Sequence, residues 1–310
     1  MSTKVGTPPG AVPATGRRGR AVDRWAGVVE GWLRGHTIAV YLFLYLPIFV
    51  VVLFAFNDTN RRVTAWDGFS VKWFGVALTD SVVHRALANS FLVAVPNAIL
   101  ATLFGTMAAL GLQRVGKKTR LAFDALVYTS IIVPEIVIAL ATLVLFATSF
   151  DVVQALTGVK LNFGHPTIIA AHVLFNTSLV LLLVRARLSG MDRTLMEASY
   201  DLFATPWRTF RQVTLPMLMP AIVAGFLLAF TFSFDDYVIT TFVSGPGSST
   251  LPLFIFGQIK RGVTPETNAV ATMILAFTIA LLLAAQAGAI WQARRQGQRG
   301  GGVAGMIAER

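Results

Sequence analysis

The chain alternates long apolar runs with shorter polar segments. Six runs are long enough to cross a bilayer, because about 20 helical residues span its hydrocarbon core. They cover residues 38–56, 87–111, 121–147, 166–184, 217–243 and 268–291. The pattern therefore predicts an all-α membrane protein with six transmembrane helices in a domain over 38–291.

The ends of the chain are hydrophilic. Residues 1–37 predict a partly disordered N-terminal tail that is too long for an ordinary signal peptide, so the first span is expected to remain as an anchor. Within this tail, residues 22–34 predict a short interfacial helix with Trp25 and Trp32 at the membrane surface. Residues 292–310 predict a C-terminal tail.

The polar segment 185–216, between the fourth and fifth runs, predicts two short helices. Asp192 is a natural N-cap for the first. Thr205 followed by Pro206 gives the second a cap residue and a proline at its first position. A membrane-protein loop that folds into a compact helical element is typical of a docking site.

The composition excludes several functional classes. The chain is 55% hydrophobic and 13% charged, far from a soluble domain. It has no cysteine, which excludes disulfides, thiol catalysis and cysteine metal sites. The four histidines lack metal-ligand spacing, so no metal is predicted. No glycine-rich phosphate loop or Ser/His/Asp motif is present, so no catalytic residue is predicted.

The positive charge follows the topology. Of the 26 lysines and arginines, 19 fall in one alternate set of segments, namely 1–37, 112–120, 185–216 and the residues after 291. The positive-inside rule places both termini and the 185–216 loop in the cytosol. The net charge of +11 is therefore interpreted as a topology signal with contact to membrane lipids, and no nucleic-acid binding is predicted.

Three acids interrupt the apolar runs: Glu135 in the third, and Asp235 and Asp236 in the fifth. A carboxylate at mid-bilayer costs at least about 2.5 kcal/mol, so it faces protein, water or a ligand. No lysine or arginine lies in the middle of a predicted span, so the acids are expected to lack a cationic partner there. This pattern favours a cationic substrate, with Phe234 and Tyr237 beside the acids as cation–π candidates.

The alternative is that Ser, Thr, Tyr or backbone groups satisfy these carboxylates. Asp235 and Asp236 are about 100° apart on a helix, so at most one points squarely into a pathway. The other is expected to face a neighbouring helix or to cap a polar break.

Other features predict helix packing. Small residues recur at four-residue spacing in three runs, and asparagines are expected to form interhelical hydrogen bonds. Prolines inside the runs predict kinks. The small residues are Ala101, Gly105 and Ala109, then Ala221, Gly225 and Ala229, then Ala280, Ala284 and Gly288; the asparagines are Asn89, Asn97 and Asn176; the prolines are Pro47, Pro96, Pro134 and Pro220.

Two stretches carry a family resemblance. Glu197-Ala198-Ser199, followed by Val213, Leu215 and Pro216, resembles the EAA loop of ABC importer permeases, although that family has glycine where this chain has Phe203. Over about 38–290 the chain resembles the second permease subunit of bacterial spermidine/putrescine ABC importers, of the binding-protein-dependent transport inner-membrane component family. Residues 229–240, 245–253 and 261–269 carry this second resemblance.

The resemblance implies a type I ABC importer permease fold in the bacterial inner membrane, translocating polyamines into the cytoplasm. It implies a second homologous permease subunit, two ATPase subunits that hold ATP and Mg²⁺, and an extracytoplasmic polyamine-binding protein, with no cofactor on this chain. The residues implied in ATPase coupling are Glu197, Ala198, Ser199, Asp201, Phe203, Ala204, Pro206, Trp207, Leu215 and Pro216.

Three rival interpretations remain open. The cargo could be another small solute, such as ferric iron, thiamine or phosphonate. The chain could be an ATP-independent secondary carrier or channel, which predicts an internal inverted repeat that is not evident here. It could be a membrane-embedded enzyme, for which no catalytic cluster is visible.

Overall fold

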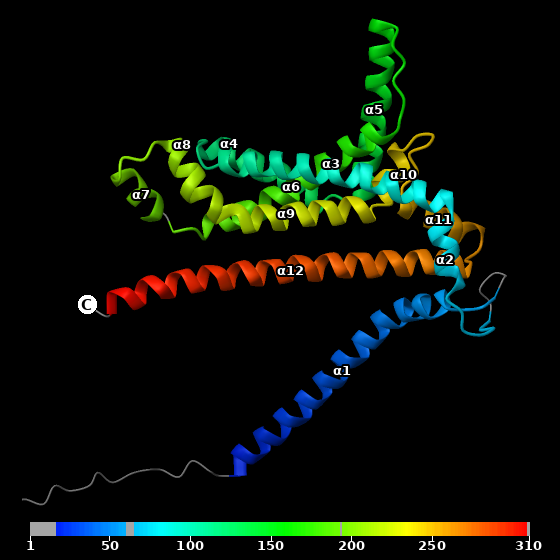
Figure 1. Ribbon diagram of the computed structural model, residues 1–310, viewed down its shortest axis with the longest axis horizontal. Helices are drawn as coiled ribbons and strands as arrows, with labels where there is room; N and C mark the ends of the chain where they lie inside the picture. The colour runs from blue at the N-terminus through cyan, green and yellow to red at the C-terminus, as the bar shows by residue number, and fades with distance from the viewer. Residues whose placement is uncertain (1–16, 60–64, 193, 309–310) are drawn as a thin grey trace, which may run out of the picture. The chain divides into compact units, whose positions relative to one another are not determined.

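The computed structural model describes residues 17–59, 65–192 and 194–308 (Figure 1). The chain divides into two units between Leu53 and Phe54. Within the described ranges the secondary structure is helical, apart from one isolated bridge between Asn57 and Phe69.

The first helix, α1, runs from Arg17 to Ala55. It joins the expected interfacial segment 22–34 and the first span into one helix, so the separate short helix predicted there was wrong. Pro47 is tolerated inside it. Its side chains from Val29 onward are mostly exposed and apolar, as expected of a helix that faces lipid. Residues 1–16 of the predicted tail lie outside the described residues.

The remaining helices belong to the second unit. They are α2 (Lys72–Thr79), α3 (Ser81–Gly111), α4 (Lys117–Ile132), α5 (Glu135–Thr157), α6 (His165–Ser189), α7 (Thr194–Asp201), α8 (Pro206–Thr209), the π-helical turn η1 (Phe210–Thr214), α9 (Leu215–Asp235), α10 (Val238–Val243), α11 (Leu251–Arg261) and α12 (Pro265–Ala308).

The number of membrane-length segments agrees with the sequence pattern. Within the described residues, six helical segments are long and apolar enough to cross a membrane. They are Val29–Ala55, Ser81–Gly111, Glu135–Thr157, His165–Ser189, Pro206–Asp235 and Pro265–Gly288. The prediction of a six-span, all-α membrane protein is confirmed, with shifted boundaries.

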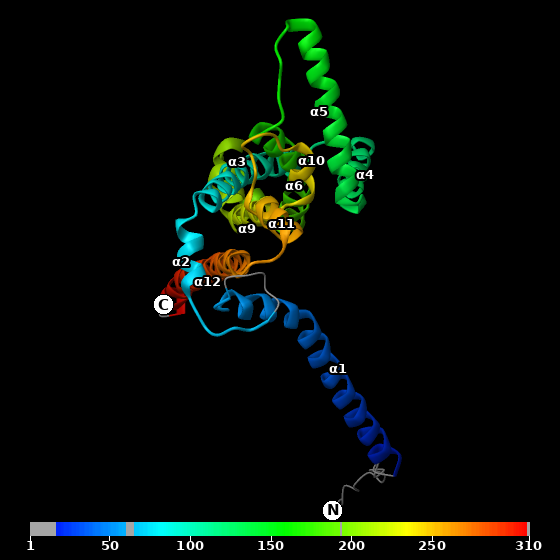
Figure 2. The same cartoon turned by 90° about the vertical axis from the view of Figure 1, so that its right-hand side faces the viewer.

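Three helices, α3, α6 and α9, lie side by side and form the core (Figures 1 and 2). The predicted small-residue faces of α3 and α9 are buried against α6. A β-carbon on Gly105 would lie 2.8 Å from that of Val180, so only glycine permits this approach. The third small-residue face, on α12, is exposed at Ala280, Ala284 and Gly288.

The predicted interhelical role of the asparagines is confirmed. Asn97 donates to the carbonyl of Ala229 at 2.9 Å and accepts from Asn176 at 3.3 Å, which links α3, α9 and α6. Asn89 donates to the carbonyls of Gly247 and Ser249, each at 2.9 Å. These bonds tie the loop after α10 to α3.

Two predicted spans are broken rather than continuous. The run 121–147 is split at Val133 and Pro134, which are extended with ψ of 130° and 136°. The residue before a proline is pushed out of the helical region, and proline itself has no N–H to continue the helix. The prediction of one continuous third span was therefore wrong, because α4 ends at Ile132 and a separate helix, α5, begins at Glu135.

The run 217–243 is likewise split. Helix α9 ends at Asp235, Asp236 is extended with ψ of 129°, and α10 begins at Val238. The two breaks lie close together, because α5 packs against α10. Polar backbone inside a membrane domain is tolerated only where protein or a cavity surrounds it.

Candidate translocation site and coupling loop

Asp236 caps the break between α9 and α10. Its carboxylate accepts hydrogen bonds from the backbone N–H groups of Ile239 at 3.3 Å and Thr240 at 2.8 Å. It also accepts from the Thr240 hydroxyl at 2.7 Å. Together these bonds satisfy N–H groups that a helix start leaves without partners. The expectation that one of the two aspartates caps a polar break is confirmed for Asp236.

Asp236 also has an ionisable partner inside the bundle. Nε2 of His172, on α6, lies 3.0 Å from the Asp236 carboxylate, and Nδ1 of the same ring lies 2.7 Å from the Ser233 hydroxyl. The side chains of His172 and Asp236 are 1% and 5% exposed. No cationic partner was expected for these acids, because no lysine or arginine lies in the middle of a span, and the contact of a histidine with Asp236 was not anticipated.

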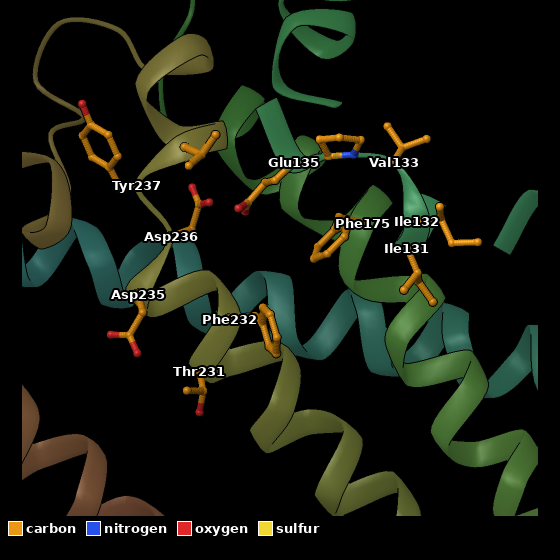
Figure 3. A pocket seen from close by; sticks show the side chains of 12 residues that line it. Ile131, Ile132, Val133, Glu135, Phe175, Thr231, Phe232, Asp235, Asp236 and Tyr237 are labelled. Atoms are coloured by element: carbon orange, nitrogen blue, oxygen red, sulfur yellow. The ribbon is translucent and has the colours of Figure 1, made fainter. Parts of the chain in front are cut away.

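Glu135 faces Asp236 from the other break. It is the first residue of α5, and its side chain is exposed. Figure 3 shows the Glu135 and Asp236 carboxylates turned toward one another. Both residues border a cavity of about 600 Å³, which is also lined by Phe175, Thr231 and Phe232. Two segments far apart in sequence thus place carboxylates at one polar opening in an apolar bundle.

The other pathway candidates differ in placement. Asp235 borders the same cavity and is exposed, but Figure 3 shows its carboxylate directed away from Glu135. Tyr237 also borders the cavity, and its ring centroid lies 4.0 Å from that of Phe256 on α11. Phe234 does not line it: its ring is 3% exposed and packs among Phe91, Phe230 and Phe277.

The two carboxylates differ in how the surrounding protein holds them. Asp236 is held by four donor groups and fixes the break, whereas Glu135 lies beside it with an exposed side chain that borders the cavity. Glu135 stands at the N-terminus of α5, and an entering cation would favour the ionised form of its carboxyl group. An acidic opening of this kind is chemically suited to a cation that binds and is then released.

The 185–216 loop folds into two short helices as predicted. A carboxylate oxygen of Asp192 accepts from the Thr194 N–H at 2.9 Å, and this bond lowers the pKa of Asp192. The Thr205 hydroxyl accepts from the Arg208 N–H at 3.4 Å, with Pro206 at the first helical position. A hydrogen bond of 2.9 Å between the Ser199 and Thr209 hydroxyls joins α7 to α8. We call residues 192–215 the elbow.

Phe203 adopts the left-handed conformation that the family glycine is expected to provide, with φ of 57°. The Ala204 N–H donates to the Ser199 carbonyl at 3.1 Å, and the Phe203 N–H donates to that of Tyr200 at 2.8 Å. This pair of bonds is a Schellman motif with Phe203 at the position that usually holds glycine. A residue with a side chain adopts it at a cost of roughly 1–2 kcal/mol.

The elbow presents its apolar side chains to solvent. Phe203 is 95% exposed, Leu202 82% and Trp207 69%. The remaining predicted coupling residues are exposed at Glu197, Ala198, Asp201, Pro206 and Pro216, and partly buried at Ser199, Ala204 and Leu215. A rigid turn that exposes adjacent large apolar residues is typical of a protein contact surface.

The elbow is connected to the core helices α6 and α9. The π-helical turn η1 widens the backbone just before α9, where Pro216 has no N–H to donate to the carbonyl of Gln212. Thr209, just before η1, and Thr214, its last residue, are buried. On the α6 side, Nε of Arg187 donates to the Met217 carbonyl at 3.2 Å. The elbow is therefore connected to both α6 and α9.

Solved structures show the same fold. A bacterial ABC transporter involved in the import of the acidic polysaccharide alginate matches with a TM-score of 0.70 and 15% identity, covering 85% of this chain and 97% of that chain. The alginate ABC transporter in complex with its pentasaccharide-bound periplasmic protein matches with a TM-score of 0.64 and 16% identity, covering 84% of this chain and 95% of that chain. The fold is that of an ABC importer permease.

Sequence comparison identifies the family. The Escherichia coli K12 putrescine transport system permease protein PotI is 40% identical over 236 residues, covering 76% of this chain and 82% of PotI. The spermidine/putrescine permease PotC of the same organism is 34% identical over 252 residues, covering 81% of this chain and 91% of PotC. Haemophilus influenzae PotC is 36% identical over 247 residues, covering 80% and 92%. Residues 101–297 match the profile of the binding-protein-dependent transport system inner membrane component family. The chain is therefore a member of that family, a multi-pass transport permease rather than an enzyme.

Proposed function

We propose that this permease translocates polyamines, of the putrescine and spermidine class, past the Glu135–Asp236 cavity. The observation that carries the proposal is the pair of carboxylates facing one opening where α4–α5 and α9–α10 are broken. A polyamine carries two or more positive charges on a flexible aliphatic chain. The acids match the ammonium groups, and Phe175 and Phe232 match the methylenes and offer cation–π contact.

The charge of the site argues against anionic cargo. Within the described lining of the cavity, the charged side chains are Glu135, Asp235 and Asp236, and all are acidic. A phosphonate would be repelled at close range by these carboxylates. The names of the permease relatives, which specify putrescine or spermidine, support the same substrate class.

The elbow is the proposed contact for the motor. Two cytosolic ATPase subunits, one for this chain and one for a second homologous permease, hold ATP and Mg²⁺, and an extracytoplasmic binding protein delivers the solute. Both termini and the elbow lie in the cytosol in this arrangement, in accord with the distribution of basic residues. Its exposed, rigid turn and its roots in α6 and α9 suit it to carry force into the bundle.

Uptake of labelled putrescine by the complete transporter tests the substrate site. Glu135→Gln removes the charge while keeping the shape, and we expect uptake at low substrate to fall by about tenfold or more, since a charged hydrogen bond contributes about 1.5–3 kcal/mol. Asp151→Asn, an exposed acid farther along α5, is the matched control and is expected to change uptake less than about twofold. Equal uptake by Glu135→Gln and the wild type would remove Glu135 from the pathway.

A second experiment tests the elbow. Glu197→Ala is expected to leave membrane insertion intact while uncoupling ATP hydrolysis from uptake in the reconstituted transporter. Lys118→Ala, an exposed change in the first turn of α4, serves as the control. Unchanged uptake per ATP hydrolysed in Glu197→Ala would argue against docking at this position. Because the chain has no cysteine, single cysteines at Leu202 and Asp67 report by labelling which side of the membrane each occupies.

A further inference from the structure

A second cavity, of about 600 Å³, lies where the ends of α3, α4 and α6 meet the elbow. It is distinct from the Glu135–Asp236 cavity and shares no lining residue with it. Its charged lining residues are Arg114, Arg120 and Arg185, and its polar ones include Gln113, Tyr128 and Ser189. A cavity of this size lies in the range of small-ligand sites.

The positive charge of this cavity is only partly neutralised within the chain. Both carboxylate oxygens of Asp124, on α4, accept from the guanidinium of Arg185, one of them at 2.9 Å. That bidentate pair fixes α4 to α6. In the described part of the chain, the guanidinium groups of Arg114 and Arg120 form no hydrogen bond or ion pair and both side chains are exposed, although the charge of Arg120 adds to the Arg185 hydrogen bond in lowering the pKa of Asp124. Two guanidinium groups therefore remain available to an anion at one opening.

The chemistry of the opening selects a phosphate group. Guanidinium presents paired N–H donors that match phosphate oxygens, and two such groups can hold one phosphate from two sides. The neighbouring surface is apolar: Leu121, Phe123 and Leu126 of α4 are exposed on sides that do not face α6. Tyr128 and Arg120, which line the cavity, stand on the same face of α4 as Asp124.

We propose that this cavity binds the headgroup of an anionic phospholipid, with the phosphate between Arg114 and Arg120 and the acyl chains along the apolar sides of α4. Basic pockets between membrane helices are suited to such headgroups. Met196 of α7 and Thr214 of η1 line the same cavity, so a bound lipid contacts both halves of the elbow. The site does not depend on which solute the permease carries.

Native mass spectrometry of the purified, delipidated full chain tests this site. Phosphatidylglycerol or zwitterionic phosphatidylcholine is added stepwise, and the bound lipids are counted. We expect the wild type to retain phosphatidylglycerol in preference to phosphatidylcholine. The double variant Arg114→Gln/Arg120→Gln is expected to weaken phosphatidylglycerol binding by about tenfold or more, because both guanidinium contacts are lost.

The matched control is Lys117→Gln/Lys118→Gln, which removes the same charge from the first turn of α4, between Arg114 and Arg120 in the sequence but outside the cavity lining. We expect it to weaken binding by about threefold or less, and both double variants to keep the wild-type melting temperature, since the four side chains are exposed. Equal retention of the two lipids, or equal loss in the two double variants, would overturn the proposal. Displacement of phosphatidylglycerol by millimolar glycerol phosphate would instead assign the cavity to a soluble phosphate and also overturn the lipid assignment.

Discussion

The imidazole of His172 and the carboxylate of Asp236 form a buried pair that fastens α6 to the break between α9 and α10, with Nε2 3.0 Å from the carboxylate oxygen. The two residues are 64 positions apart in the sequence. The pair fixes the non-helical backbone at Asp236, which in turn forms one wall of the Glu135 cavity. Stability and the proposed transport route therefore depend on the same contact.

Replacement of His172 by alanine is expected to destabilise the protein by about 3 kcal/mol or more, because it leaves a buried carboxylate without its partner. Thermal unfolding in detergent, followed by tryptophan fluorescence, measures the change. Ser233→Ala, which removes only the hydroxyl beside the other ring nitrogen, is expected to cost about 1 kcal/mol. A His172→Ala protein that melts with the wild type would show that the pair contributes nothing to stability.

Phe203→Gly is expected to stabilise the elbow while weakening its function. Glycine removes a left-handed strain of roughly 1–2 kcal/mol, and its own conformational entropy offsets about 0.5–1 kcal/mol of that gain. The exposed aromatic ring is lost at the same time, so ATP-driven uptake should fall. Protease resistance of the elbow and uptake by the complete transporter provide the two measurements.

Phe203→Asn separates these two effects. Asparagine tolerates the left-handed region better than phenylalanine does, and it also lacks the aromatic ring. We expect it to behave as Phe203→Gly does in uptake, with a smaller gain in protease resistance. If either variant transports at the wild-type rate, the ring is dispensable for coupling, and its strain has no functional explanation.

Gly245 occupies a position where a side chain has no room. A β-carbon there would overlap the carbonyl group of Phe163, in the segment before α6. The Gly245 N–H donates to the Ser248 hydroxyl at 2.8 Å, which closes the turn after α10. Gly245→Ala is expected to cost about 1–3 kcal/mol and to reduce uptake, because the turn must move. Gly257→Ala, in the interior of α11 with open space at the β-carbon, should be neutral or stabilising by up to about 1 kcal/mol.

Sequence patterns predicted the elements whose signals are local. The N-cap residues Asp192 and Thr205 appear where their side chains were expected to accept hydrogen bonds. The membrane-length runs were recognised because each contains enough consecutive apolar residues to form a helix. The sequence showed that Phe203 replaces the family glycine but not which conformation it adopts; the φ of 57° shows that Phe203 takes the left-handed conformation itself.

The division of two runs into separate helices and the buried pair were not predicted, for different reasons; Pro134 predicted only a kink, and capping of a polar break was one of two expectations for the second aspartate. Both broken runs stay apolar on either side of the break, so a hydropathy average does not detect the break. The local signals were Pro134, which restricts the residue before it, and Asp236, a residue type that favours helix starts. The contact of His172 with Asp236 joins distant segments and has no local pattern. A lone histidine within an apolar run was the available sign of a polar partner.

The close approach of α3 and α6 at Gly105 allows a test of helix packing by a double-mutant cycle. A β-carbon on Gly105 would lie 2.8 Å from Cβ of Val180. Gly105→Ala is therefore expected to cost about 1–3 kcal/mol through overpacking, and Val180→Ala to cost a similar amount through the cavity that it leaves. In the double variant the new methyl group occupies part of that cavity, so its loss of stability should be smaller than the sum by about 1 kcal/mol or more.

Gly111→Ala, on the same helix with open space at its β-carbon, provides the control pair with Val180→Ala and should give additive losses. Additive losses in the Gly105 cycle as well would mean that the two helices adjust their separation freely, in contrast to a core fixed by the contact between Gly105 and Val180.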